Sequence, residues 1–579
     1  MKQLRRFVFL SAALAVATAA PAQERKAERG AAVPLPVPAW GCRHADLIVR
    51  GAIYTDVRGA ASPAMAVRDG KVVAVGTNLQ ITRCAGPHSK VLTLPPGQPI
   101  IPGLIDTHTH ALDWAKGVLR NEIDLGAPAV RSIADASRLV AERAARARPG
   151  QWILGFGWSD SRLAEQRYIH RADLDAVSPD NPVYLVHVSG HLAVANSAAL
   201  RLAGIARETA EPAGGVIERD ERGQPTGILK DNAMALLARL LPRDPADLAE
   251  RAARLVSDEA LRAGLTTIHD FGLTPGDMRG YQAARQSGAL RLRVHLVPNV
   301  ESYAGAESLV ARGVATGFGD DRLKLGAAKL FADGGMAART VAIYPPPVEG
   351  EPENFGLLLW SNQELQRTHK LLAAHGWQIA THAIGDRAID QVLDSYAAVT
   401  AELHPRDPRF RIVHCGISTP AIQKRLREMN VLVDGNPPFL YFISKWFERY
   451  GAERARWSYP GKSYVENSII AGGGSDVGVT PLTPWWGIWA GVARQRLGDG
   501  VVVAPEERLT VREILTWYTR NGAYIGFEEN TKGTLQPGRL ADFIVLDRDI
   551  FSMPAGELKD VQVLKTFVAG ELVYEKKKE

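Results

Sequence analysis

Cysteine is scarce in this sequence, and charge of neither sign dominates it. Three cysteines occur among 579 residues, so the chain is not a small disulfide-stapled domain. The formal net charge is +6, and half of that excess comes from Lys2, Arg5 and Arg6, which precede the first acidic residue, Glu24. A balance so close to neutral excludes the basic footprint of a nucleic-acid-binding protein.

Long hydrophobic runs are also missing from most of the chain. Hydrophobic residues make up 46% and charged residues 23%, values that exclude disordered, collagenous and polytopic membrane proteins. The one extended apolar run, residues 7–20, is shorter than the roughly 20 residues of a membrane span. Basic residues precede it and Ala20-Pro21-Ala22 follows. This pattern predicts a signal peptide at residues 1–22, cleaved after Ala22, with an uncleaved N-terminal anchor as the alternative.

A signal peptide implies a protein that is exported, periplasmic or secreted, without a stable membrane anchor. Residues 23–41 include a Pro-rich stretch and are predicted to be a linker. Because an exported protein meets an oxidising compartment, Cys42 and Cys84 either form a disulfide or remain two buried thiols. The sequence leaves this choice open, and it also leaves open whether the chain forms an oligomer.

The two ends of the mature chain have similar patterns. Strand-like segments occur at residues 45–54 and 64–75, with Asp69-Gly70 as a hairpin turn. Further strand-like segments occur at residues 541–546, 563–568 and 571–574. Residues 42–100 and 531–579 are therefore predicted to form one small β-sandwich built from both termini.

The middle of the chain alternates between strand-like and helix-like segments. Eight strands are expected, ending at Thr107, Phe271, Val297, Asp333, His382, His414, Asp434 and Asp476. Repeated βα units imply a parallel sheet, and eight of them predict an α/β protein with a (β/α)₈ barrel over residues 101–530. The gap after the first strand is too long for one crossover, so an insertion is expected at about residues 112–260. Helical stretches at 132–146 and 247–263 lie within it.

Polar residues recur where the predicted strands end, which is where barrel active sites form. Alternation along a strand places His108 and His110 on one side, so both imidazoles can bind one cation. This motif alone is common by chance. His382, His414 and Asp476 close three further strands. Lys329 lies inside another strand, where burying an ammonium group is costly.

These residues resemble the metal-dependent amidohydrolase superfamily, and within it the amidohydrolase 3, or YtcJ-like, branch, which includes N-substituted formamide deformylases. The motifs that carry the resemblance span most of the mature chain. They are residues 102–110 (PGLIDTHTH), 190–200 (GHLAVANSAAL), 329–334 (KLFADG), 382–388 (HAIGDRA), 474–476 (GSD) and 533–542 (GTLQPGRLAD).

The resemblance implies a site with two divalent metal ions. It assigns His108 and His110 to one ion, His382 and His414 to the second, Lys329 to both as a bridging N6-carboxylysine, and Asp476 to the roles of ligand and base. Zinc is the default metal for imidazole and carboxylate ligands, with manganese, iron and cobalt as alternatives. His191 matches the branch's substrate-side histidine, which implies stabilisation of a developing oxyanion.

Such a site implies a hydrolase acting on a small molecule. A hydroxide shared by the ions would attack a carbonyl carbon, and the branch favours an amide, N-acyl or N-formyl C–N bond. Esterase, lactonase and dipeptidase activities are alternatives on the same site. A mononuclear deaminase is less favoured, because such enzymes often carry a glutamate three residues after the histidine at 382, where this chain has Gly385. A non-catalytic binding or regulatory protein is the alternative from another class.

Weaker candidates surround this set. His269 and Asp270 are interpreted as partners of ligands or as packing residues, and Asp333 and Asp386 as residues that orient loops or ligands. His187 is a candidate for the pocket wall. The aromatic residues of segment 483–489 (TPWWGIW), including Trp485 and Trp489, either line an apolar pocket or pack a barrel helix. If they line the pocket, the substrate has an apolar or aromatic group.

Overall fold

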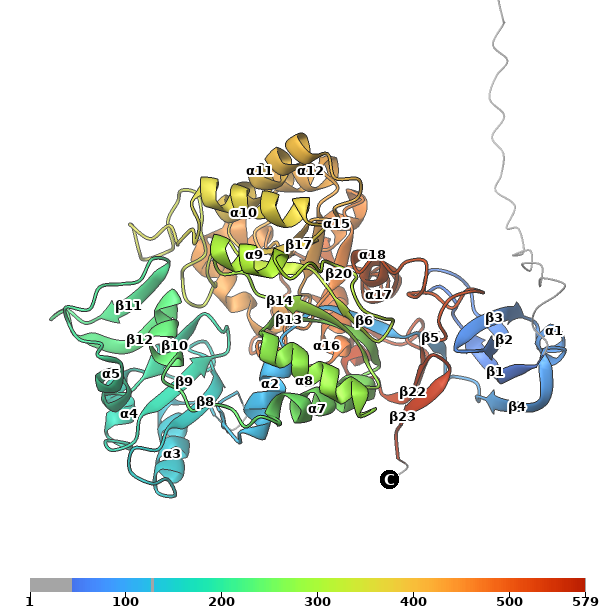
Figure 1. Ribbon diagram of the computed structural model, residues 1–579, viewed down its shortest axis with the longest axis horizontal. Helices are drawn as coiled ribbons and strands as arrows, with labels where there is room; N and C mark the ends of the chain where they lie inside the picture. Colours follow the sequence, from blue (N-terminus) through green and yellow to red (C-terminus); the bar gives the residue numbers. More distant parts are fainter. Residues whose placement is uncertain (1–43, 127–129, 578–579) are drawn as a thin grey trace, which may run out of the picture. The chain divides into compact units, whose positions relative to one another are not determined.

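The computed structural model describes residues 44–126 and 130–577. Within these residues the strands form four hydrogen-bonded sheets (Figure 1), of which two are wholly parallel and flanked by helices. The predicted α/β class is confirmed. The predicted signal peptide, the linker and Cys42 lie outside the described residues. Cys84 is buried and disulfide-bonded, and Cys415 is buried and free.

Both ends of the chain contribute to one eight-stranded sheet. Its strands are β1 (Ala45–Ile53), β2 (Ser62–Arg68), β3 (Lys71–Gly76), β4 (Ala85–Thr93), β5 (Ile100–Pro102), β21 (Phe543–Leu546), β22 (Val563–Val568) and β23 (Glu571–Glu575). The order is β23-β22-β21-β5-β1-β2-β3, with β4 also paired to β1. Strand β5 pairs with β1 on one side and with β21 on the other. The N-terminal and C-terminal strands that were predicted to form a sandwich are therefore hydrogen-bonded into one continuous sheet. Asp69 and Gly70 form the predicted turn between β2 and β3, both with positive φ.

The middle of the chain supplies two parallel sheets. The first contains β6 (Leu104–Thr109), β13 (Leu265–Leu273), β14 (Arg293–Pro298) and β15 (Leu323–Leu325). The second contains β16 (Ala328–Phe331), β17 (Ile379–Ala383), β18 (Arg411–His414), β19 (Leu432–Gly435) and β20 (Ala471–Gly473). Asn299 and Lys329 bridge the sheets at one junction. At the other, the backbone N–H of Asp476 donates to the carbonyl of His108 (2.8 Å). A closed barrel of these two sheets requires a contact at each of the two junctions.

Helices follow the parallel strands and cover them. They include α2 (Ala111–Leu119), α7 (Leu248–Arg262), α8 (Pro275–Gln286), α9 (Tyr303–Val310), α10 (Asn362–Ala374), α11 (Asp386–Leu403), α12 (Pro420–Glu428), α16 (Pro484–Ala493) and α17 (Val511–Thr516). Strand β20 ends at Gly473, three residues before the predicted Asp476, because the chain turns away there and Asp476 has a φ of 51°. No helix among the described residues combines the length and apolar character needed to cross a membrane.

The segment after the first parallel strand contains a separate six-stranded sheet. Its strands are β7 (Ile123–Asp124), β8 (Ile153–Trp158), β9 (Val183–His187), β10 (Leu192–Ala195), β11 (Gly215–Arg219) and β12 (Pro225–Asp231). The sequence predicted an insertion here but not this sheet. Of the two predicted helices, α3 (Ile133–Ala144) belongs to the insertion, whereas α7 packs against α2 and α8. The insertion is therefore shorter than the predicted 112–260.

A buried ion pair connects β14 to the sheet formed by the termini. The Arg293 guanidinium donates to both oxygens of Asp542 (2.7 and 2.9 Å), and both side chains are almost fully buried. Asp542 also accepts from the backbone N–H of Ala569. Because one partner cannot be removed without leaving a buried charge, this pair fastens the two sheets together.

We expect Asp542→Ala to lower the free energy of unfolding by about 3–5 kcal/mol, because it leaves the Arg293 guanidinium buried and unpaired. Urea denaturation followed by circular dichroism measures the change. Glu142→Ala is the control, since it removes an exposed ion pair with Arg138 (2.7 Å) and is expected to cost less than about 1 kcal/mol. Equal losses in the two variants would contradict the role of the buried pair.

Candidate metal centre

The six residues predicted as metal ligands meet at the carboxyl ends of the parallel strands. The His108 ring lies 5.0 Å from that of His414 and 5.2 Å from that of His110, centroid to centroid, and the rings of His382 and His414 are 4.7 Å apart. One Asp476 oxygen lies 3.5 Å from Nε2 of His108 and 3.6 Å from Nε2 of His110. Lys329 Nζ lies 5.1 Å from the centre of the Phe271 ring, which packs on His108.

The close approach of β20 to β6 places Asp476 beside the two histidines. Asp106, on the same side of β6 as His108, accepts hydrogen bonds from the backbone N–H groups of His108 (3.0 Å) and Ser475 (3.2 Å). A Cβ atom on Gly474 would lie 2.8 Å from the Cβ of His108. A glycine is therefore required where the strands come together. Burial raises the pKa of Asp106 to about 7.

Several candidate ligand atoms are buried without partners. Within the described residues, neither ring nitrogen of His108 has a hydrogen-bond partner, and the same holds for Nδ1 of His382 and Nζ of Lys329. Burial holds the pKa values of His108, His382 and His414 well below the usual range for histidine. It also lowers the pKa of Lys329 to about 7. Orphaned polar atoms are costly, and neutral imidazoles with free nitrogens are suitable metal ligands.

Hydrogen bonds orient two of the other imidazoles. His414 Nδ1 lies 2.7 Å from the side-chain oxygen of Asn436, and His382 Nε2 lies 3.1 Å from the carbonyl of Gly334. Asp333 accepts from the backbone N–H groups of Ala342, Ile384 and Gly385 and lies 3.4 Å from His382. As predicted for a loop-orienting residue, Asp333 holds together the segments on either side of His382.

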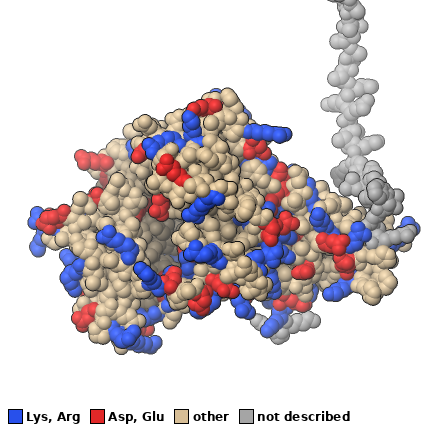
Figure 2. All heavy atoms as spheres, viewed as in Figure 1, with Lys and Arg blue, Asp and Glu red and all other residues tan. Residues whose placement is uncertain are grey.

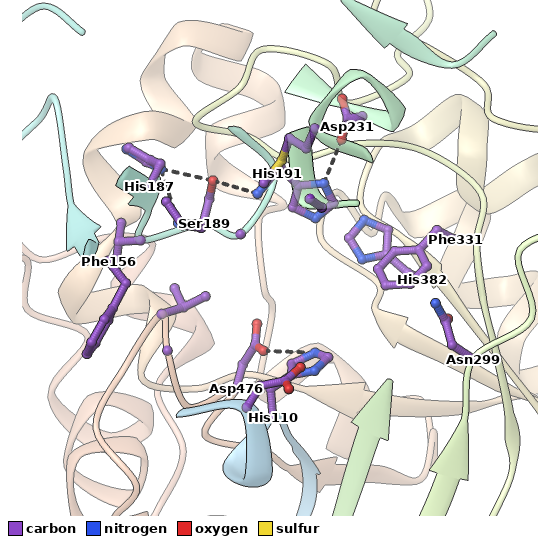
Figure 3. A pocket seen from close by; sticks show the side chains of 18 of the residues that line it. His110, Phe156, His187, Ser189, His191, Asp231, Asn299, Phe331, His382 and Asp476 are labelled. Carbon is purple, nitrogen blue, oxygen red and sulfur yellow. Dashed lines mark hydrogen bonds and ion pairs between the residues drawn. The ribbon is translucent and has the colours of Figure 1, made fainter. Parts of the chain in front are cut away.

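His191 reaches the same cavity from the insertion. Its ring lies 5.0 Å from that of His382, and its Nδ1 lies 2.7 Å from Oδ1 of Asp231. Figure 3 shows His191 next to His382, with Asp476 and His110 across the open space. The sequence analysis did not identify Asp231, because it is near its partner only through the pairing of β10 with β12.

Four other candidates lie outside the ligand set. His269 stacks on His295 (4.0 Å), and Asp270 caps α2 by accepting from the backbone N–H groups of Ala111 and Leu112. Asp386 pairs with Arg454 (3.1 Å). His187 lines the cavity as predicted, with Nδ1 2.9 Å from the hydroxyl of Ser189.

The centre opens into a cavity of about 680 Å³ between the parallel strands and the insertion. Its aromatic wall consists of Trp114, Phe156, Phe331 and Trp360. The tryptophans of segment 483–489 do not line it within the described residues: Trp485 and Trp489 are buried around α16, and Trp486 stacks on Tyr441. Helix packing therefore accounts for Trp486 and Trp489, whereas Trp485 also lines a neighbouring cavity. The face shown in Figure 2 is hollowed. Acidic and basic side chains are interspersed over it.

The donor set fits divalent transition-metal ions. Imidazole nitrogens and a carboxylate suit zinc and its neighbours, and His108, His414 and Asp476 bring ligand atoms within 4.8 Å of one another. His110, His382 and Lys329 extend this group. A metal ion would give one ring nitrogen of His108 the partner it lacks, and carboxylation of Lys329 would provide oxygens that can bind the metal.

Comparisons with known proteins agree with this geometry. Residues 97–574 match a family model described as "Amidohydrolase family" (Amidohydro_3). The chain belongs to the amidohydrolase family. This confirms the resemblance found in the motifs, and the protein is a hydrolase of the metal-dependent amidohydrolase superfamily.

Individual relatives of this amidohydrolase match nearly the whole chain. It is 30% identical to "Putative amidohydrolase YtcJ" of Bacillus subtilis over 91% of this chain and 98% of the relative. It is 29% identical to "N-substituted formamide deformylase" of Arthrobacter pascens, covering 92% and 98%. A solved structure of an uncharacterized metal-dependent hydrolase from Pyrococcus furiosus is 25% identical, with a TM-score of 0.68 over 87% of this chain and all of that one.

We expect Lys329→Ala to lose both bound metal and hydrolysis, because the variant lacks the group that can become a bridging carboxylate. Short carboxylic acids should restore part of both. Elemental analysis and a hydrolysis assay measure the two effects. Lys370→Ala, on the surface of α10, is the control. Full metal content and full activity in Lys329→Ala would contradict the bridging role.

Proposed function

We propose that this amidohydrolase hydrolyses the C–N bond of a neutral N-acyl or N-formyl compound that has an apolar or aromatic group. The observation that carries the proposal is the convergence of four histidines, Lys329 and Asp476 at a cavity with an aromatic wall. Five of these six residues line the cavity, and His108 is fully buried beside them. In this proposal His108 and His110 hold one divalent ion and His382 and His414 a second. Lys329 bridges them as N6-carboxylysine, and zinc is the default metal.

Two such ions would polarise the scissile carbonyl and lower the pKa of a water molecule towards neutrality. Asp476 then acts as the general base: its oxygen lies beside His108 and His110 at the cavity floor, within reach of a water proton, and it returns that proton to the leaving nitrogen. His191 faces the floor from the insertion and stabilises the negative charge that develops on the carbonyl oxygen.

The charges around the cavity favour a neutral substrate over a dipeptide. Among the described residues that line it, Lys329 is the one lysine or arginine, and the proposal assigns it to the metals. The other charged residues of the lining include the acids Asp113, Glu122 and Glu301. A dipeptide or an N-acyl amino acid would bring a carboxylate into this cavity without a cationic side chain to pair with it, which is unfavourable.

The structure around Gly385 argues against a deaminase. A Cβ atom at this position would lie 1.8 Å from the carbonyl oxygen of Ala342, so a glutamate cannot occupy it without moving the backbone. Esterase and lactonase activities use the same attack on a carbonyl and are secondary candidates. A non-catalytic binding protein does not need the buried base Asp476 or the full ligand set.

The proposed location is the periplasm or the medium, because residues 1–22 have the pattern of a signal peptide. Cys84 is disulfide-bonded, which suits an oxidising compartment. The substrate is accordingly a small molecule available outside the cytoplasm.

The first test uses a matched pair of substrates that differ by one carboxylate. We expect N-formyl- or N-acetyl-2-phenylethylamine to be hydrolysed with a kcat/KM at least about tenfold above that of the corresponding phenylalanine derivative, because an unpaired carboxylate is costly to bury. Release of the free amine measures both rates. A preference for the phenylalanine derivative would contradict the neutral-substrate proposal, and hydrolysis of esters alone would replace it with an esterase.

Asp476→Asn tests the general base. We expect kcat to fall about 10²–10⁴-fold, while the thermal unfolding midpoint changes little. Asparagine tolerates the positive φ of this position, so the backbone should be retained. Asp499→Asn, in an exposed loop, is the control. Turnover within a few-fold of the unmodified enzyme would exclude Asp476 as the base.

A further inference from the structure

A histidine and an aspartate of the insertion form a pair at the edge of the metal centre. His191 immediately precedes β10 and Asp231 ends β12, and these strands are antiparallel neighbours. The backbone N–H of Asp231 donates to the carbonyl of His191 (2.9 Å), and the side chains meet between His191 Nδ1 and Asp231 Oδ1 (2.7 Å). Both residues line the cavity, as Figure 3 shows.

The Asp231 side chain is buried at a cost that secondary structure does not explain. Its carboxylate is 2% exposed, and Oδ2 has no hydrogen-bond partner among the described residues. Its backbone has a φ of 48° and ψ of −125°, which is unfavourable for a residue with a side chain. Backbone strain of this kind persists where the surrounding structure requires a side chain in one place. Here that place is beside Nδ1 of His191.

The loop after β16 is shaped around the same pair. A Cβ atom on Gly335 would lie 2.8 Å from the His191 ring, and one on Gly334 would lie 2.7 Å from Asp231 Oδ2. The two glycines therefore let the loop pack directly against the ring and the carboxylate. With Nδ1 bound to Asp231 and the loop against the ring, His191 has one remaining nitrogen, Nε2, to present to the cavity.

We infer that Asp231 is a positioning residue: it accepts a hydrogen bond from Nδ1–H of His191 and so directs Nε2 at the carbonyl oxygen of a bound substrate. The doubly protonated ring is the form that can donate from Nε2–H to this oxygen, because a carboxylate only accepts. The inference rests on the proposed function, which gives His191 the oxyanion. Asp231 touches neither substrate nor metal ligands in this role and acts only through the His191 ring. In this inference the parallel strands supply the residues that bind metal, and the insertion supplies the histidine that stabilises the oxyanion.

A double-mutant cycle tests this dependence. We expect Asp231→Ala to lower kcat about 10²–10³-fold with KM changed little, because an oxyanion donor acts in the transition state. In the His191→Ala background, Asp231→Ala should have no further effect on kcat, because residues that act as a unit are not additive. Asp231→Asn keeps an acceptor oxygen for Nδ1 and should retain kcat within about tenfold of the unmodified enzyme.

Asp220→Ala is the matched control, because Asp220 is an exposed acid in the turn between β11 and β12 of the same sheet. Metal content and the unfolding midpoint are measured for every variant. An equal further loss of kcat in the His191→Ala background, or a loss of metal in Asp231→Ala, would overturn the inference and make Asp231 a structural residue.

The cycle is run on whichever carbonyl substrate the unmodified enzyme hydrolyses. If that substrate proves to be an ester, the proposed C–N specificity fails, while the coupling between His191 and Asp231 is still measured. The two failures are therefore distinguishable.

Discussion

The site depends on one constraint: the parallel strands bury ligand atoms for which the described protein supplies no partners. Within the described residues, His108 is fully buried with no hydrogen bond to either ring nitrogen, and Lys329 is fully buried with no hydrogen bond to Nζ. Leaving such groups unpaired costs several kcal/mol in an apolar interior. A metal centre would reduce that cost, since an ion would bind one His108 nitrogen and carboxylation would give Lys329 oxygens that can bind the ions. In this account the binding of metal also stabilises the fold.

The surrounding structure keeps this array in place. Gly474 allows the chain after β20 to approach His108. Asp106 accepts hydrogen bonds from the backbone of both His108 and Ser475. Asp333 does the same for the backbone that follows His382. Partners of this kind fix the orientation of ligands and are as much a part of a metal site as the ligands themselves. The insertion contributes the opposite wall, so a substrate in this cavity would lie between the parallel strands and the insertion.

The sequence predicted the parallel strands and singled out polar residues near their ends because both follow a local rule, whereas the assignment of these residues to two metal ions came from the family resemblance. Apolar strands end in polar residues at barrel active sites, and Lys329 is conspicuous in a strand because a buried ammonium needs a reason. Asp231 was not predicted because no local sequence pattern identifies it. It lies 40 residues after His191 in the sequence, and the antiparallel pairing of β10 with β12 brings the two side chains together. The insertion sheet was also missed. Its strands are short, and one of them, β7, has two residues, too few to show a period.

The aromatic wall illustrates a different limit. The sequence offered two interpretations of the tryptophan-rich segment 483–489, a pocket wall or helix packing, and apolar residues on all sides of a short helix indicate burial. None of its tryptophans lines the cavity above the metal centre within the described residues. The residues that line the cavity, Trp114, Phe156, Phe331 and Trp360, are single aromatics from four separate segments. Only the three-dimensional arrangement brings them together, so composition cannot identify such a wall.

The central claim is that the buried array binds two metal ions. The most direct measurement is the number of metal ions per chain, determined by plasma mass spectrometry on protein exported and purified without chelators or a histidine tag. The account predicts about two ions per chain. One ion per chain would remove the bridging role of Lys329, and none, even after addition of zinc and bicarbonate, would contradict the account.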